Sequence, residues 1–337
     1  MAKESDSIKI LEYDDIYKNL QQYLQEGGRP GLPVCFKSFG DLYSHKAGGV
    51  TDWTGFPASG KTYFALEILM GLSEKYGQRH GLYVPDIGSE NEIMQKLVKM
   101  RTGKDFHDKY QNKISPKDLA SAMNWILHHF IIFKKKDFKK GITPIAFWEK
   151  VAEFRDGPDN LGRLNTGLAD SWKNFKHVYQ NREDSYLDEM LSIRNEMSED
   201  YQVHYHTIAH AVKTELAAAL TKNDKGKRRI PTAWDIKGGG SWNANGKNII
   251  TIDRPDLTST WVDVYVNKVK PEDVGIIGSV QNKIKLDIRK GRYYELIGSG
   301  NYFSYEYEKI PVQEEMDFNT MPPMDIFSMA EEQEAPF

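Results

Sequence analysis

The residues with the most specific chemical pattern lie between Gly55 and Thr62. The segment Gly55-Phe56-Pro57-Ala58-Ser59-Gly60-Lys61-Thr62 has the spacing G-x-x-x-x-G-K-[ST]. Its glycines let the backbone wrap a phosphate without a Cβ in the way, and its N–H groups form an anion cradle with the start of a following helix. We expect Lys61 to contact the β- and γ-phosphates of ATP and Thr62 to hold Mg²⁺. The remaining ATP-binding residues are then Gly55, Pro57, Ala58, Ser59 and Gly60.

The elements expected around this loop are those of an α/β protein. A strand over 50–54 runs into the loop, and a helix over 61–76 follows it. Further strands are expected at 82–84, 130–133, 203–209, 248–253 and 261–269, with a hairpin over 284–296 that turns at 290–291. Helices are expected over 13–26, over 89–130 with a break at 115–116, and over 183–197. This order predicts a mostly parallel twisted sheet flanked by helices, with antiparallel edge strands.

The bulk composition excludes several classes of protein. The 337 residues carry a formal net charge of −3, so any contact with nucleic acid must come from a local basic surface. The single cysteine, Cys35, allows no internal disulfide and no thiolate metal cluster, which favours a reducing cytoplasm. The charged N-terminus has no apolar core for a signal peptide, and no run approaches the length needed to span a membrane.

A Mg²⁺-dependent ATPase also needs a carboxylate on the metal side and a residue that positions the attacking water. By pattern alone, the best apolar run that ends in an acid is Ile249-Ile250-Thr251-Ile252-Asp253. A weaker candidate is Gly167-Leu168-Ala169-Asp170, whose preceding residues are unusually polar for a buried strand. The pattern leaves both aspartates open.

Several landmarks together resemble those of a known family. The P-loop is followed by Pro85-Asp86 at a strand end, Asp170-Ser171-Trp172-Lys173-Asn174, the strand segment 206–213 with His210 near its end, the Gly-rich segment 231–242, and Asp253-Arg254. Their order resembles the RecA-like, DnaB-type ring helicases, in particular the Twinkle and phage helicase–primase branch, over about residues 40–300. The resemblance implies a RecA-like P-loop NTPase fold.

The resemblance assigns roles that the pattern alone leaves open. It favours Asp170 over Asp253 as the Mg²⁺-side carboxylate, and it makes His210 a γ-phosphate sensor. Asp86 takes the place of the catalytic carboxylate, although that residue is usually a glutamate in the family, so Glu90 or Glu92 could serve instead.

Two further roles involve basic residues. The resemblance makes Arg254 an arginine finger that acts on the ATP of a neighbouring subunit; the alternative is a surface salt bridge. Lys268 and Lys270 form a K-x-K similar to the family's K-x-R near the subunit boundary, which places Lys268 near ATP; the alternative is an exposed strand edge.

The segment 213–237 carries many more basic than acidic residues and precedes a Gly-rich loop. In this family that position faces the central channel of the ring, and a basic loop suits backbone contacts to a single strand. The alternative is a solvated charged loop. Trp242 could stack on a base or belong to the core. The candidate DNA-binding residues are Lys225, Lys227, Arg228, Arg229, Lys237, Gly239, Ser241 and Asn243.

The resulting hypothesis is the motor domain of a replicative-type DNA helicase that uses ATP and Mg²⁺ to move along single-stranded DNA. We expect a lead helix and linker over 1–45 that packs on a neighbouring subunit, a RecA-like domain over 46–310, and an acidic disordered tail over 311–337. The expected assembly is a homo-oligomeric ring, a hexamer by resemblance, in the cytoplasm of a bacterium or a phage-infected cell. The tail, which ends in Phe337, is expected to dock a primase, polymerase or single-strand binding protein. The rival hypotheses are a RecA-like recombinase and an ATP-binding replication loader without motor activity.

Overall fold

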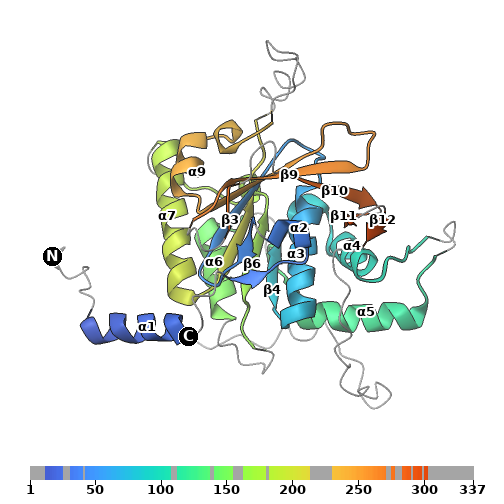
Figure 1. The fold of residues 1–337 in the computed structure, drawn as a ribbon, viewed down its shortest axis with the longest axis horizontal. Coiled ribbons are helices and arrows are strands. Elements are labelled where there is room, and N and C mark those ends of the chain that lie inside the picture. Colours follow the sequence, from blue (N-terminus) through green and yellow to red (C-terminus); the bar gives the residue numbers. More distant parts are fainter. Residues whose placement is uncertain are drawn as a thin grey trace, which may run out of the picture. The chain divides into compact units, whose positions relative to one another are not determined.

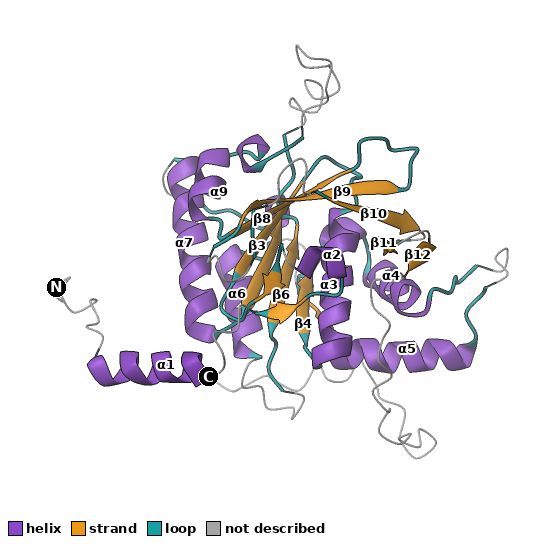
Figure 2. Cartoon of the chain, in the orientation of Figure 1, coloured by secondary structure: helices purple, strands orange, loops and turns teal. Residues whose placement is uncertain are grey.

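The computed structural model describes residues 12–25, 31–40, 42–107, 112–136, 140–154, 162–179, 182–212, 230–270, 275–277, 283–289, 291–297 and 300–302. Its helices are α1 (Tyr13–Gln25), α2 (Lys37–Gly40), α3 (Lys61–Tyr76), α4 (Glu90–Thr102), α5 (Pro116–His129), α6 (Pro144–Glu153), α7 (Glu183–Tyr201) and α9 (Gly239–Asn245). Short 3₁₀ turns cover Pro85–Ile87, Trp172–Asn174 and Ala233–Asp235. Figures 1 and 2 show α3, α4, α6 and α7 around a central sheet.

The central sheet has ten strands in the order β12-β11-β10-β9-β8-β3-β7-β6-β4-β5. Its strands are β3 (Val50–Thr54), β4 (His80–Tyr83), β5 (Phe130–Ile132), β6 (Thr166–Asp170), β7 (His204–Ile208), β8 (Asn248–Asp253), β9 (Trp261–Lys268), β10 (Ile284–Arg289), β11 (Arg292–Ile297) and β12 (Gly300–Tyr302). The strands from β8 to β5 run parallel, and those from β9 to β12 are antiparallel. A separate two-stranded sheet pairs β1 (Leu32–Pro33) with β2 (Ser44–His45). The predicted fold class is confirmed.

The parallel strands are buried on both faces, so their residues alternate between two hydrophobic clusters. On β3, Trp53 joins a cluster with α3, α4 and α5, whereas Val50 joins a cluster with α6 and α7. On β6, Leu168 and Ala169 divide between the same two clusters. This burial explains why β6 is a central strand although its preceding residues are polar: the sheet supplies backbone partners on both sides.

Most predicted elements are confirmed within a residue or two, and the exceptions have local causes. The break expected at 115–116 within the helical stretch 89–130 is confirmed by the cap at Ser115, where α5 begins, but the interruption is longer than predicted because α4 already ends at a left-handed Gly103. Helix α6 was not predicted; it begins after Thr143, whose side chain caps the N–H of Ala146, with Pro144 at its first position. The Gly-rich loop expected at 237–243 instead forms the short helix α9.

Some predictions fall outside the described residues. These are the basic cluster at 225–229 and the acidic tail at 311–337. The domain boundaries also stay predictions. Within the described ranges, no helix has the length and apolarity that crossing a bilayer requires.

Candidate functional site

The candidate site lies where the parallel strands β3, β4, β6 and β7 end. The carboxyl ends of parallel strands meet at one edge of the sheet, which is where α/β proteins bind ligands. Strand β3 continues into the P-loop and α3, while β4 leads to Asp86, β6 ends at Asp170 and β7 is followed by His210. Residues as far apart in the sequence as Gly55 and His210 thus converge on one edge.

Backbone geometry explains why the P-loop needs its two glycines. Gly55 has φ +141° and Gly60 has φ +97°, values that residues with a Cβ rarely adopt. A Cβ on Gly55 would lie 2.2 Å from the carbonyl oxygen of Ile252 on β8. Helix α3 begins directly after Gly60, so the free N–H groups of its first turn stand at the loop.

Lys61 lies buried against the loop that precedes it. Its Nζ donates hydrogen bonds to the carbonyl oxygens of Gly55, at 3.0 Å, and Phe56, at 2.7 Å. Burial lowers the pKa of Lys61 to about 8, against the opposing attraction of Asp170 and Asp86. The buried ammonium group of Lys61 is poorly solvated, so a nearby polyanion such as a triphosphate would stabilise its charged form.

Thr62 and Asp170 form the part of the site that suits a divalent cation. Thr62 Oγ1 donates to Asp170 Oδ2 at 2.6 Å. Asp170 is buried, which raises the pKa of its carboxyl, and among the described residues its Oδ1 has no hydrogen-bond partner. A hydroxyl beside a carboxylate with one unsatisfied buried oxygen offers the hard oxygen ligands that Mg²⁺ prefers, so these residues fit the ion.

Asp86 is held by polar groups from two other strand ends. Its carboxylate accepts hydrogen bonds from Asn174 Nδ2 at 2.7 Å and Ser171 Oγ at 3.1 Å, and it lies 3.3 Å from Lys173 Nζ. Burial opposes ionisation of Asp86, but the hydrogen bonds from Asn174 and His210 and the charge of Lys173 lower its pKa below the usual value. Asp86 is therefore ionised at neutral pH.

The two alternative carboxylates have other partners. Glu90 forms a 3.1 Å ion pair with Lys134. Glu92 accepts from Ser89 in the capping box that starts α4, at 2.6 Å from the Ser89 backbone nitrogen. Asp86, and neither glutamate, lies in the group with Asp170 and His210, in which one ligand atom of each residue lies within 4.8 Å of the others.

His210 connects Asp86 to the end of β7. Its Nε2 lies 3.3 Å from Asp86 Oδ2, and its Nδ1 is buried with no hydrogen-bond partner among the described residues. Burial, together with the charge of Lys61, lowers the pKa of His210 despite the neighbouring Asp86. The imidazole is therefore neutral at pH 7.

Arg254 and Lys268 have other hydrogen-bond partners. Arg254 follows β8, the neighbour of β3, and its Nε and Nη2 donate to the carbonyl oxygen of Ser259 at 2.9 and 2.6 Å. Lys268 ends β9 and donates to the carbonyl oxygen of Asn243 at 2.5 Å. Asp253, the other candidate from the pattern, is buried within β8, opposite Asp263 on β9.

The candidate DNA-binding residues that the structure describes surround helix α9. Gly239 and Ser241 are buried, and Asn243 is half-buried. Lys237 forms a 2.6 Å ion pair with Glu183 of α7. A hollow beside them is lined by Asp184, Asp188, Gly238, Gly239, Gly240, Ser241 and Ala244. A phosphate entering here would meet carboxylates, and Lys237 would have to exchange its partner, a change that costs little for an exposed pair.

The structure distinguishes between the tryptophans of this region. Trp242 is fully buried, so the possibility that it stacks on a base is excluded in this conformation. Trp234 has 64% of its surface exposed, on a 3₁₀ turn closed by Thr232 and Asp235. The turn is tied to the segment after His210, since Val212 N donates to Asp235 O at 2.8 Å and Ala211 bridges to Ile236. Sequence reasoning missed Trp234, because only burial separates it from Trp242.

Comparisons with known proteins agree with this architecture. No protein-family model matches the chain. Over 285 residues it is 23% identical to the Twinkle homolog protein, chloroplastic/mitochondrial, of Arabidopsis thaliana; the match covers 80% of this chain and 38% of that protein. The chain thus spans well under half the length of this relative.

Two solved structures share the fold. The ATPase domain of G40P matches with a TM-score of 0.67 and 16% identity, over 86% of this chain and 100% of that chain. A DnaB-like replicative helicase, solved in a study of its interactions with primase, matches with a TM-score of 0.64 and 17% identity, over 86% and 68%. The chain has the RecA-like fold of a DnaB-like helicase ATPase domain and is distantly similar to Twinkle, which confirms the predicted resemblance.

Proposed function

We propose that the protein is an ATP-driven motor that moves along single-stranded DNA, of the kind that unwinds duplexes during replication. The observation that carries the proposal is the Thr62–Asp170 hydrogen bond beneath the P-loop, with Asp86 and His210 beside it. These groups supply an anion cradle, a site for a divalent cation, an ionised carboxylate and a neutral imidazole within one cluster. The substrate is ATP.

Each side chain has a distinct task in hydrolysis. Lys61 and the backbone N–H groups at the start of α3 bind the phosphates, while Thr62 and Asp170 hold Mg²⁺. The ion, when bound, neutralises charge that develops on the phosphates. Asp86, kept ionised by Asn174 and Lys173, accepts a hydrogen bond from the attacking water and orients it. Asp86 is one methylene shorter than glutamate, and its partners from β6 fix its position.

His210 links the nucleotide to the DNA side. A neutral imidazole with an unsatisfied buried nitrogen can exchange its contact with Asp86 for one with a terminal phosphate. Its neighbours Ala211 and Val212 are bonded to the turn that displays Trp234. A shift at His210 would therefore reach Trp234 through three or four residues of backbone.

The proposed DNA contacts combine charge with one aromatic side chain. Lys225, Lys227, Arg228 and Arg229 supply the basic backbone contacts, and Trp234 offers a ring on which a base can stack. The adjoining α9 region contains the other candidates, Lys237, Gly239, Ser241 and Asn243. There the available contact is between the DNA and backbone groups of the protein.

The proposed assembly is a ring of identical subunits. Helix α1 exposes Tyr13, Ile16, Tyr17, Leu20, Tyr23 and Leu24, which recur at the spacing of one helix face. This apolar stripe suits packing on a second copy of the chain. Arg254, which follows the carboxyl end of β8, would then serve as the finger for a neighbour's ATP. Lys268 and Lys270 lie beside Ile249 and Asn248 at the opposite end of β8 and would approach a subunit boundary there. The acidic tail would dock a primase, polymerase or single-strand binding protein.

The test is ATP hydrolysis measured with and without single-stranded DNA, together with images of the protein bound to an ATP analogue and DNA. The proposal expects DNA-stimulated hydrolysis, closed rings and unwinding of a forked duplex. Open filaments without unwinding would instead favour a recombinase. ATP binding without DNA-stimulated hydrolysis would favour a loader without motor activity.

A second experiment tests the trans role of Arg254. Arg254→Ala should remove DNA-stimulated hydrolysis, and mixing it with Lys61→Ala should restore part of the activity, because some interfaces then combine an intact P-loop with an intact finger. If mixed rings form and remain inactive, Arg254 is not a finger that acts on a neighbouring subunit.

A further inference from the structure

Strand β11, far from the P-loop in the sequence, contacts the glycine that closes the loop. Tyr293 lies on β11, and its hydroxyl donates a hydrogen bond to the carbonyl oxygen of Gly60 at 3.0 Å, across 233 positions of sequence. A Cβ on Gly60 would lie 2.2 Å from that hydroxyl oxygen, so the tyrosine fits against the bare glycine.

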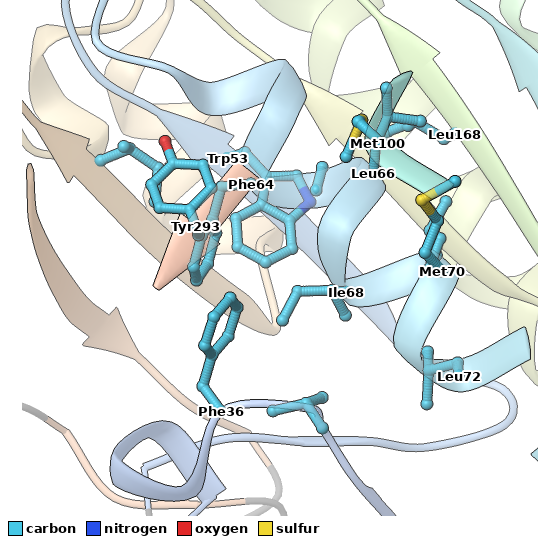
Figure 3. Packing of buried hydrophobic residues seen from close by; sticks show 14 of the residues in the cluster. Phe36, Trp53, Phe64, Leu66, Ile68, Met70, Leu72, Met100, Leu168 and Tyr293 are labelled. Atoms are coloured by element: carbon cyan, nitrogen blue, oxygen red, sulfur yellow. The ribbon is translucent and has the colours of Figure 1, made fainter. Parts of the chain in front are cut away.

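The ring of Tyr293 is fixed by the core. It is fully buried and packs edge-on against Phe64, with ring centroids 5.1 Å apart, and against Phe36 at 6.4 Å. Figure 3 shows Tyr293 beside Phe64 and Trp53 in the packed cluster over α3. Burial raises the pKa of the Tyr293 hydroxyl, which therefore remains protonated and able to donate at neutral pH.

Neighbouring residues of β11 attach the same strand to α3 and α2. Arg292 donates to both carboxylate oxygens of Glu67 on α3, at 2.8 and 3.0 Å, and both side chains are buried. Glu295 accepts from the backbone nitrogens of Lys37 and Ser38 at the start of α2. The position of Tyr293 relative to the P-loop is thus determined on both sides along its strand.

The geometry of the peptide group links the Tyr293–Gly60 contact to phosphate binding. The carbonyl of Gly60 and the N–H of Lys61 belong to one planar unit and point in opposite directions. Gly60 O also accepts from the backbone nitrogen of Phe64 at 3.0 Å, which is the first hydrogen bond of α3. Two donors behind the carbonyl orient the Lys61 N–H forward, toward the space the phosphates would occupy.

We propose that Tyr293 is a positioning residue for phosphate binding: its hydroxyl holds the Gly60–Lys61 peptide with the N–H facing the phosphates. The proposal rests on the proposed function, because it assigns the P-loop to ATP. Tyr293 does not touch substrate. It acts through the peptide group, and its absence leaves that peptide free to tilt at a left-handed glycine.

The test compares two Tyr→Phe variants that each lose one buried hydroxyl. Tyr205→Phe is the matched control, since the hydroxyl of Tyr205 donates to the carbonyl oxygen of Trp148 at 2.9 Å, in the cluster with α6 and α7. Both variants lose one hydrogen bond, so their melting temperatures should fall by similar small amounts. Tyr293→Phe alone should raise the KM for ATP about three- to tenfold, the range that one neutral hydrogen bond supports.

Four further outcomes are decisive. Replacing Tyr293 by p-aminophenylalanine, which keeps a donor at the same place, should restore most of the affinity. Equal KM values for the two Phe variants would overturn the proposal, as would loss of folding in Tyr293→Phe alone, since the hydroxyl would then hold the fold and not the peptide. A wild-type chain that binds no ATP removes the proposed function itself, an outcome seen before any variant is made.

Discussion

The parallel and antiparallel parts of the sheet contribute to the site in different ways. The strands β3, β4, β6 and β7 each deliver a polar side chain to the same edge through the loop that follows them. The antiparallel strand β11 instead reaches the P-loop from behind, through Arg292 on Glu67 and Tyr293 on Gly60. One part presents the reacting groups and the other restrains the loop that carries them.

The difference lies in what each part must tolerate. A loop at a strand end can carry polar residues because solvent or substrate satisfies them. A strand that packs on α3 must bury its contacts, so β11 uses a buried ion pair and the hydroxyl of a buried tyrosine. Substitutions of the strand-end site residues in the parallel part should therefore lower activity, whereas substitutions of the β11 contacts in the antiparallel part should lower stability and phosphate affinity together.

The largest effect should come from the P-loop lysine. Lys61→Ala should lower hydrolysis by about 10²–10³-fold or more, because it removes the cation that binds the phosphates. The melting temperature should change little. Lys75→Ala, at an exposed lysine on the same helix, is the control. Hydrolysis at the wild-type rate in Lys61→Ala would rule out the P-loop as the catalytic site.

The next effect should come from the ion pair behind the loop. Arg292→Met leaves Glu67 charged and buried, and should lower the free energy of unfolding by about 3–5 kcal/mol. A matched pair exists in the parallel part, where Arg194 Nη1 lies 2.5 Å from Asp52 Oδ1 and both are buried. Denaturant titrations give the unfolding free energies of Arg292→Met and Arg194→Met, and steady-state kinetics give their KM for ATP. Together these values should distinguish the roles of the two parts of the sheet.

Both arginine variants should lose stability, but only Arg292→Met should also raise the KM for ATP. Adding Glu67→Gln to Arg292→Met should recover part of the stability by removing the uncompensated charge. If Arg194→Met raises KM as much as Arg292→Met does, the proposed division between the two parts of the sheet is wrong.

The sequence predicted the parallel part well, because its signals are local. The P-loop spacing, the strand over 50–54 and the helix over 61–76 each depend on residues that are neighbours in the chain. The hairpin over 284–296 was also predicted, with its turn. The contacts of this hairpin with the P-loop and α3 were not predicted, because the Tyr293–Gly60 and Arg292–Glu67 contacts join positions more than 220 residues apart. No pattern in either segment identifies the partner.

Burial was the second quantity that sequence could not supply. Trp234 and Trp242 lie in one short Gly-rich segment, and only packing distinguishes the exposed ring from the buried one. The choice between Asp86, Glu90 and Glu92 stays a prediction. It is favoured by contacts that no local pattern gives, since Asp86 lies with Asp170 and His210 whereas Glu90 pairs with Lys134 and Glu92 accepts from Ser89.

A smaller effect is expected at the exposed tryptophan. Trp234→Ala should weaken binding to an oligo-dT single strand by about 1–3 kcal/mol, the usual contribution of one base–aromatic stack. Leu257→Ala, at a similarly exposed apolar residue between β8 and β9, should leave affinity unchanged. Fluorescence anisotropy at fixed salt measures both. If Trp234→Ala binds the single strand as tightly as the wild type does, bases do not stack on Trp234 and the stacking surface lies elsewhere.

The smallest effect concerns acid sensitivity of the parallel part. His45, His204 and His206 are stacked and buried, with the rings of His45 and His204 4.1 Å apart. Burial lowers the pKa of His204 to about 4. The unfolded chain binds a proton near the ordinary histidine pKa of about 6.5, so this contribution is complete above that pH and is lost as the pH falls toward 4.

Each such histidine adds a slope of about 1.4 kcal/mol per pH unit inside that window. His204→Asn should therefore flatten the pH dependence of the unfolding free energy by up to that amount, whatever it does to stability at pH 7. His128→Asn, at an exposed histidine, should not. An unchanged slope in His204→Asn would mean that the histidine stack takes up protons without unfolding.

The contact between Tyr293 and Gly60 also has a consequence for folding during synthesis of the chain. Ribosomes add about 5–20 residues per second, so the 233 positions that separate the two residues correspond to roughly 10–50 s of synthesis. During that interval the strand, loop and first helix of the P-loop exist without the strand that restrains them. A nascent chain would therefore acquire its phosphate affinity late, after the parallel strands have been made, and a free nucleotide pool would help to fold the completed chain more than the growing one.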